Sequence, residues 1–154
     1  MKYEKIWEKT LSSDEKVEVE FSIGDRYRKF GIVGWGIVDL LLLFVVGSSI
    51  FIFLVIHFFI VLFYNGYYLK VANAYAFTNK RVLIHRGWLS THTISVDYSK
   101  ITDVHITEPF FDKIITHTGN IAINTAGTTI DQIMLRHIKS PYEIKKQLDI
   151  LKDK

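Results

Sequence analysis

Residues 36–59, GIVDLLLLFVVGSSIFIFLVIHFF, are almost wholly apolar, yet they include the acid Asp39 and the imidazole of His57. In the wider segment 30–64, Asp39 is the one formal charge, whereas the flanks hold all 19 Lys and Arg and the other 15 acidic residues. A soluble domain of 154 residues would spread its charges more evenly around a mixed core. This segregation predicts that the segment lies in a lipid bilayer.

The apolar segment is typical of two helices joined by a tight reversal. Stretches 30–46 and 48–64 have 17 residues each. At 1.5 Å per residue, each helix would span roughly 25 Å, which is the lower limit for crossing the hydrocarbon core. Gly47, Ser48 and Ser49 form the natural reversal point, so we predict a transmembrane helical hairpin. The alternative is a buried helical pair in a soluble protein, but the flanking residues could hardly cover both helices on all faces.

Basic residues on both flanks of the hairpin indicate its topology. Arg26, Arg28 and Lys29 precede the apolar segment and Lys70 follows it, while the connection between the two helices is uncharged. By the positive-inside rule, both flanks are expected in the cytoplasm. The chain is therefore predicted to be a multi-pass protein of the inner cell membrane with both termini cytoplasmic.

Asp39 and His57 are equally far from residue 48, so the hairpin would place them opposite each other. By helical rise, both would lie about 13 Å below the turn, near the middle of the bilayer. Ionisable groups at that depth are costly and tend to face a partner or a wet cavity. We therefore predict a hydrogen bond between Asp39 and His57, within one hairpin or between protomers. Its role is interpreted as structural pairing of helices, with a proton relay or ion path as the alternative.

The chain after the hairpin is typical of an antiparallel β-region. Residues 74–136 form short runs rich in Val, Ile, Thr, Phe and Tyr, broken by turn residues. Asn79 and Lys80 form a predicted two-residue hairpin turn. An alternating stretch at 17–23 predicts a further short strand that docks on this region. The predicted β-runs after the hairpin are 74–78, 81–87, 87–96, 103–107, 119–127 and 129–138.

The end of the chain predicts a helix. Residues 140–143, SPYE, match a capping box with Pro141 at the first helical position. Ile144, Leu148 and Leu151 then form one apolar stripe, so a helix of about three turns is expected to pack on the sheet. Several strands followed by one amphipathic helix indicate a small antiparallel barrel or sandwich that the helix closes.

Several motifs of the β-region carry a family resemblance. The stretches YAFTNKRVLIHRGWL, SKITDVHI and GNIAINTAG and the proline-led last helix resemble the bacterial pleckstrin-homology-like (PH) domain family of membrane-tethered proteins. The residues that match its Tyr-x-x-Thr-x-x-Arg opening, its glycine and its later Ile-x-x-Val are Tyr75, Thr78, Arg81, Gly87, Ile101 and Val104. The resemblance covers about residues 70–150. It implies a seven-stranded, strongly bent antiparallel sheet that is closed by a C-terminal helix and attached to the membrane.

We therefore expect an α+β membrane protein with three parts. Residues 1–29 form a cytoplasmic N-terminal segment whose short strand docks on the β-domain. Residues 30–64 form the two-helix transmembrane hairpin. Residues 70–154 form a PH-like antiparallel β-sandwich or barrel closed by the C-terminal helix.

Two parts of the β-domain are candidate contact surfaces. Lys80, Arg81 and Arg86 lie on the first β-hairpin, close in sequence to the membrane exit, and could contact anionic lipid headgroups. The alternative is that they are ordinary solvated strand ends. The segment 108–115, EPFFDKII, would offer Phe110 and Phe111 as an interaction or membrane-touching surface if it were exposed, but burial in the core is the commoner fate of aromatic residues at this spacing.

The sequence contains no recognisable catalytic or metal-binding motif. It has no Cys, no nucleophile elbow and no phosphate-binding loop. Asp103 and His105 share one face of a strand, but the histidine spacings match no metal site, so a surface role is favoured over metal-dependent catalysis. The histidines of the β-region are His85, His92, His105, His117 and His137. We expect no enzyme activity, no cofactor and no metal. The basic residues are few and interspersed with acids, so no nucleic-acid binding is expected.

The leading functional hypothesis is a non-enzymatic, membrane-anchored PH-like binding or assembly module at the cytoplasmic face, with an unknown ligand. Its expected partners are the lipid bilayer, anionic headgroups, and a further copy of the chain or another membrane protein. One alternative is a subunit of an oligomeric transporter or channel that uses Asp39 and His57. Another is metal-dependent catalysis on the β-domain.

Overall fold

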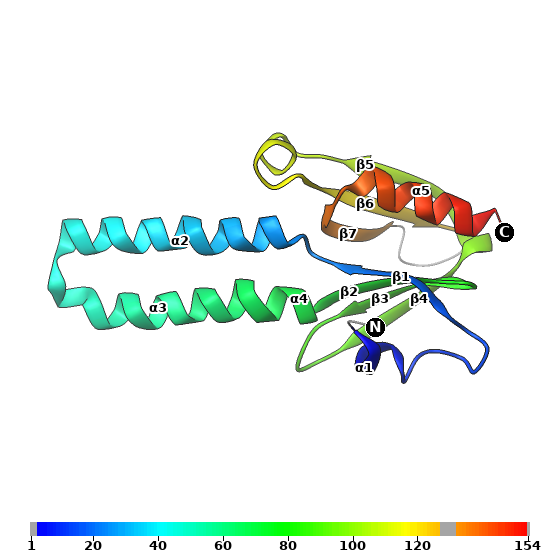
Figure 1. The fold of residues 1–154 in the computed structure, drawn as a ribbon, viewed down its shortest axis with the longest axis horizontal. Coiled ribbons are helices and arrows are strands. Elements are labelled where there is room, and N and C mark those ends of the chain that lie inside the picture. The colour runs from blue at the N-terminus through cyan, green and yellow to red at the C-terminus, as the bar shows by residue number, and fades with distance from the viewer. Residues whose placement is uncertain (1–2, 127–131, 154) are drawn as a thin grey trace.

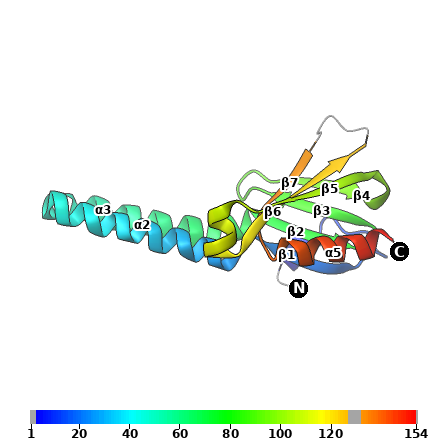
Figure 2. The ribbon, with the colours of Figure 1, turned by 90° about the horizontal axis from the view of Figure 1, so that it is seen from above.

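Two long apolar helices and a β-domain make up the computed structural model of the protein, which describes residues 3–126 and 132–153. The two helices pack together and project as a rod from one end of the β-domain (Figures 1 and 2). The β-domain combines two antiparallel sheets with a C-terminal helix. The architecture is therefore α+β.

The rod is a helical hairpin. Its first helix, α2, spans Asp25–Val46, and its second arm is helical throughout Ser48–Val71. The second arm contains a 3₁₀ turn and a π-helical turn, in the order Ser48–Ile50 (3₁₀), α3 (Phe51–Phe63), Tyr64–Tyr68 (π) and α4 (Leu69–Val71). Gly47 lies between the arms with a φ of 82°, a left-handed conformation that favours glycine, at the predicted reversal point.

The two arms have 22 and 24 residues, so they are longer than the 17 residues predicted for each. The predicted helix lengths are based on hydropathy, so each predicted helix ends where the sequence becomes polar. The backbone stays helical past that point, through Asp25 and Lys29 at the start of α2 and through Asn65 and Lys70 on the second arm. Helix ends are set by backbone hydrogen bonds rather than by apolar composition.

Seven strands in the described part of the chain form two separate sheets. The first has the order β1-β2-β3-β4 and the second has the order β5-β6-β7, and all neighbours are antiparallel. The strands are β1 (Val17–Ser22), β2 (Asn73–Thr78), β3 (Arg81–Arg86), β4 (His92–Asp97), β5 (Ile101–Thr107), β6 (Thr118–Thr125) and β7 (Gln132–Lys139). Residues 127–131 lie outside the described residues. The end of the predicted strand 119–127 and the start of the predicted strand 129–138 fall in this range.

The two sheets face each other as a sandwich, and the barrel alternative is wrong. Within the described residues, one isolated bridge, between Ile23 and Ile138, is the backbone pairing that joins the sheets. The chain passes from β4 to β5 through a 3₁₀ turn at Tyr98–Lys100, which breaks the ladder at that corner. The sheets are therefore held together by side-chain packing rather than by continuous hydrogen bonding.

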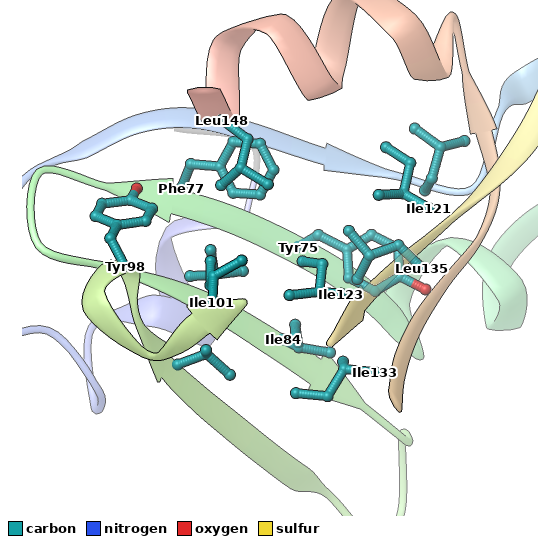
Figure 3. Close-up of a cluster of buried hydrophobic side chains, with 13 residues drawn as sticks. Tyr75, Phe77, Ile84, Tyr98, Ile101, Ile121, Ile123, Ile133, Leu135 and Leu148 are labelled. Atoms are coloured by element: carbon teal, nitrogen blue, oxygen red, sulfur yellow. The ribbon is translucent and has the colours of Figure 1, made fainter. Parts of the chain in front are cut away.

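The main core lies between the two sheets and under the last helix, α5 (Pro141–Lys152) (Figure 3). Tyr75 and Phe77 from β2 pack there with side chains of β6 and β7, and Leu148 of α5 reaches the same cluster. Ile144 and Leu151 are partly buried against it. The predicted apolar stripe of the last helix thus closes the sandwich.

The predicted capping box is wrong, although Pro141 does occupy the first turn of α5. Ser140 has a φ of 49°, in the left-handed region, and its side chain makes no capping hydrogen bond. Its carbonyl oxygen accepts from the backbone N–H of Glu143 instead. A capping serine needs an extended backbone to aim its hydroxyl at the helix, and Ser140 does not have one.

The N-terminal segment is part of the β-domain. The predicted strand is present as β1, which pairs along β2 from Val17 to Ser22. The preceding helix α1 (Glu4–Trp7) places Trp7 in a second, smaller core that the sequence did not indicate. The fully buried Trp7 packs there against β2 and β3, on residues that include Ala74 and Leu83.

The β-domain has two distinct ends. At the hairpin end, where α2 and α4 leave, lie the β3–β4 loop (residues 87–91) and the β5–β6 loop (residues 108–117) (Figure 1). At the far end lie the β2–β3 turn and the 3₁₀ corner Tyr98–Lys100. The register of β2 with β3 sets this arrangement, because it pairs Asn73 with Arg86 and leaves the turn at the opposite end of both strands.

Candidate functional site

The Asp39–His57 pair predicted from the sequence is present as a contact inside one hairpin. His57 Nδ1 lies 2.7 Å from Asp39 Oδ1, which is hydrogen-bonding distance. Trp35 covers the imidazole edge-on, with the ring centroids 5.5 Å apart. The contact joins the middle of α2 to the middle of α3.

One atom of this pair is left over. Within the described residues, the buried Oδ2 of Asp39 has no hydrogen-bond partner. His57 is the more exposed member, at 40% of its side chain against 11% for Asp39. The pair therefore links the two arms through one bond and presents its imidazole, not its carboxylate, to the surroundings of the rod.

A second polar contact ties the two arms together at the base of the rod. Arg28 donates from Nη1 to the carbonyl oxygens of Asn65 and Gly66, at 3.1 and 2.7 Å. A π-helical turn leaves backbone carbonyls without their usual intrahelical N–H donors, and the Arg28 guanidinium donates to these carbonyls instead. Close packing accompanies this contact, because a Cβ at Gly31 would lie 2.5 Å from Asn65 Oδ1. Arg28 is thus a structural residue as well as a predicted topology signal.

A cavity of about 620 Å³ lies where the base of the rod meets the β-domain. Its apolar wall comes from both parts and includes Phe30 and Trp35 of α2 and Ile115 of the β5–β6 loop. Its polar wall includes Arg136 and His137 of β7. The cavity is therefore amphipathic, with an apolar side that continues onto the surface of the rod.

Three residues that are far apart in sequence meet beside this cavity. His137 Nδ1 lies 3.1 Å from Asp112 Oδ2, and the ring of Tyr27 stacks on the imidazole with centroids 3.7 Å apart. Burial lowers the pKa of His137, and the carboxylate of Asp112 opposes that shift. Sequence reasoning missed this cluster, because no spacing motif relates residues in α2, the β5–β6 loop and β7.

The three basic residues proposed for headgroup contact do not lie together. Lys80 and Arg81 lie at the far end of the β-domain, whereas Arg86 lies at the hairpin end of the same strand. Lys80 pairs with Asp14, and Arg86 donates to the carbonyl of Met134 at 2.6 Å. Arg81 and Arg86 are the first and last residues of the six-residue strand β3, so the three charges do not gather on one surface.

Arg81 instead binds a buried carboxylate of the N-terminal segment. Its Nε and Nη2 donate to the two oxygens of Glu15, at 2.9 and 2.8 Å, and Thr78 Oγ1 donates to the same carboxylate at 2.8 Å. The hydrogen bond from Arg81 is the main cause that lowers the pKa of Glu15 to about 2. The residues of the Tyr-x-x-Thr-x-x-Arg motif thus have structural roles, because Tyr75 packs in the core and Thr78 and Arg81 bind Glu15.

The aromatic segment 108–115 is exposed, so the favoured expectation of core burial is wrong. Phe110 and Phe111 expose 70% and 71% of their surface, and Ile114 and Ile115 are exposed beside them. The segment follows β5 and continues into a π-helical turn at Asp112–Thr116. It lies next to the base of α2, which is the position that a membrane-touching surface would need.

The predicted histidines do not converge. Asp103 and His105 do pair, with His105 Nε2 2.7 Å from Asp103 Oδ2, but both side chains are more than half exposed. His85 is buried beside Trp7, and burial lowers its pKa. In residues 3–126 and 132–153, no three His, Asp or Glu side chains are grouped to hold a metal ion.

Comparisons with known proteins agree with this fold. The family model described as bacterial PH domain matches residues 32–152, and so begins well before the region 70–150 that carries the sequence resemblance. One similar crystal structure is a DUF1696 family protein with a pleckstrin-homology domain from Shewanella loihica PV-4, with 10% identity and a TM-score of 0.54, covering 98% of this chain and 91% of that chain. Another is a pleckstrin homology domain from Shewanella amazonensis SB2B, with 12% identity and a TM-score of 0.51, covering 96% and 82%. These identities show likeness of fold alone. No curated protein matches the sequence significantly.

Proposed function

Because the chain belongs to the bacterial PH domain family, we propose that it is a membrane-anchored, non-enzymatic binding module at the cytoplasmic face of the inner membrane. In this proposal, the helical hairpin (residues 30–64 and the helical ends that extend it) anchors the protein. Residues 3–24 and the described residues after the rod, 72–126 and 132–153, together form the displayed β-domain. The partner is another membrane protein or a further copy of the chain.

The observation that carries the proposal is the exposure of the rod. Both arms are long and apolar enough to cross a bilayer, yet only 6% and 11% of their most apolar stretches is buried within the protein. Helices of a soluble core would be covered by the rest of the chain, and these project away from it (Figures 1 and 2). Large apolar side chains such as Phe44 and Phe53 would face water without a membrane.

The pairing of β1 with β2 supports a hairpin rather than two independent spans. β1 leads into α2, β2 follows α4, and Ser22 is paired with Ala74 at the base of the rod. This pairing supports the proposal that both flanks lie on one side of the membrane. Basic residues on both flanks favour the cytoplasmic side.

The β-domain offers binding surface on its sheet edges. β4 pairs with β3 on one side and β5 pairs with β6 on one side, and within the described residues neither strand has a second neighbour. An open edge can add a strand from a partner. His92 of β4 is exposed on such an edge.

Alkaline carbonate extraction of bacterial membranes that contain the full chain tests the anchor. We expect the intact protein to remain in the membrane pellet, and its release into the supernatant would contradict the proposal. A photo-crosslinking amino acid at position 92 tests the module, since a retained partner should be captured there in native membranes. The same amino acid at the exposed position 150 of α5 is the matched control.

A further inference from the structure

Exposed apolar side chains of the β-domain are concentrated at its hairpin end. Outside the rod, the described residues expose eight large apolar side chains. Six of them belong to the two loops at this end, and a seventh, Tyr142, lines a cavity together with residues of the β5–β6 loop. The exception is Ile150 of α5. The seven are Trp88, Leu89, Phe110, Phe111, Ile114, Ile115 and Tyr142. Scattered surface hydrophobes would not segregate in this way, so the end of the domain that faces along the rod is an apolar surface.

The β5–β6 loop (residues 108–117) supplies most of this surface and is held in a defined shape. Thr116 Oγ1 donates to the carbonyl of Asp112 at 2.9 Å and lies 2.7 Å from Thr118 Oγ1. The Asp112 carboxylate is bound by His137 of β7. These contacts fix the base of the loop, while Phe110 and Phe111 at its start point into no core.

This loop lies at the level of the first turns of α2. Phe111 and Ile115 line the same cavity as Phe30 and Trp35, which belong to the apolar part of the rod. Lys113 of the loop is 67% exposed at its side chain. Exposed aromatic rings with a neighbouring lysine are suited to the boundary between acyl chains and headgroups.

The β3–β4 loop (residues 87–91) provides a second apolar contact, next to the other arm of the rod. The ring of Trp88 lies 5.4 Å from that of Phe63 and 5.9 Å from that of Tyr67. Leu89 exposes 90% of its surface. Figure 1 shows one loop beside α2 and the other below α4, so the two loops flank the hairpin.

We propose that these two loops insert into the lipid leaflet beside the hairpin, so that the β-domain is held against the bilayer at three places. The occupant of the apolar surface is lipid, because both loops are continuous with the apolar rod. The β5–β6 loop shares a cavity with Phe30 and Trp35, and Trp88 of the β3–β4 loop packs on Phe63 and Tyr67. The inference rests on the proposed membrane hairpin. It adds that the domain has one fixed orientation to the membrane and does not hang from a free tether.

The absence of Cys makes a direct test simple. Four single-cysteine variants, Phe110→Cys, Leu89→Cys, Phe44→Cys and Ser99→Cys, are labelled with a polarity-sensitive fluorophore. They are reconstituted as full chains in vesicles of phosphatidylcholine and phosphatidylglycerol. Each replaced side chain is exposed, so the fold is expected to tolerate the change. The readouts are the emission maximum and quenching by nitroxide-labelled lipid.

We expect blue-shifted emission and strong lipid quenching at positions 110 and 89, as at position 44 in the rod, and neither at position 99 at the far end. Lipid contact at position 44 with water-exposed labels at 110 or 89 would overturn the two-loop inference and leave the anchor intact. A blue shift at 110 or 89 without lipid quenching would show a protein contact and would overturn it equally. A water-exposed label at position 44 would overturn the anchor itself.

Discussion

Glu15 joins the N-terminal segment to the β2–β3 hairpin through a carboxylate that is fully removed from solvent. Both of its oxygens are used, since Arg81 binds them as a fork and Thr78 and the backbone N–H of Ser12 complete the shell. A buried carboxylate without these donors would be strongly disfavoured in its charged form. The stability of this corner should therefore depend on pH.

The expected pH dependence follows from the direction of the pKa shift. Folding lowers the pKa of Glu15 from 4.5 to about 2, so the ionised pair stabilises the fold above pH 4.5. That contribution, on the order of 3 kcal/mol, is lost as the pH falls from 4.5 towards 2. Thermal unfolding should show Glu15→Gln less stable than the parent at pH 7, with the difference shrinking through this range. A difference that is constant with pH would contradict this assignment.

Asp39 and His57 provide a test at the centre of the rod. Hydrogen bonds between membrane helices contribute about 1 kcal/mol, so we expect a coupling of that size between Asp39→Ala and His57→Ala in a double-mutant cycle. The free energy of unfolding in detergent is the measurement, and Leu40→Ala is the neighbouring control, because its side chain is exposed. Proteoliposomes should show no ion flux. A flux that disappears in His57→Ala would favour the channel alternative over structural pairing.

Among the connecting elements, the β3–β4 loop has a backbone shape that requires glycine at position 87. Gly87 has a φ of 95°, and a Cβ there would lie 1.9 Å from the carbonyl oxygen of Ser90. The obstacle is backbone, which cannot move aside as a flexible side chain could. The same loop carries Trp88 and Leu89, so its shape also determines where these side chains lie.

Gly87→Ala should therefore destabilise the β-domain by roughly 1 to 3 kcal/mol. Gly34→Ala is a suitable control, because nothing lies within 4 Å of a Cβ at that helical position. Alanine is also the better helix former, so the control should be neutral or slightly stabilising. Unfolding midpoints of the two variants in the same detergent make the comparison. Equal midpoints for both would show that the loop relaxes around the added methyl group.

In the protein as a whole, the β1–β2 pairing and the hairpin together constrain the membrane topology. The two flanks are parts of the same sheet, so the proposed membrane hairpin requires them to lie on one side of the membrane. The connection at Ser48 and Ser49 is at the other end of the rod. The protein is thus a domain whose chain leaves and re-enters at adjacent strands.

Accessibility of single cysteines to a membrane-impermeant maleimide measures this topology. Ser13→Cys and Ser99→Cys should both react in inverted vesicles and neither in right-side-out vesicles, because both exposed positions belong to the β-domain. Ser49→Cys at the turn of the rod should show the reverse pattern. Opposite sidedness of positions 13 and 99 would contradict the hairpin.

The hairpin, the strands and the meeting of Asp39 with His57 were all predictable from the sequence. Hydropathy and strand alternation are local properties, and equal helical rise on both arms determines which residues face each other. The same reasoning placed Asn79 and Lys80 in the β2–β3 turn, which the structure has at that position.

Contacts between distant segments could not be predicted in this way. Glu15 and Arg81 are 66 residues apart, and Asp112 and His137 are 25 residues apart in separate elements. Such pairs meet because of strand register and the packing of one sheet on the other, and no periodicity in the chain encodes either. For the same reason, the sequence did not predict that the turn with Lys80 lies at the end of the β-domain away from the rod. The exposure of Phe110 beside the rod is likewise a property of the tertiary structure.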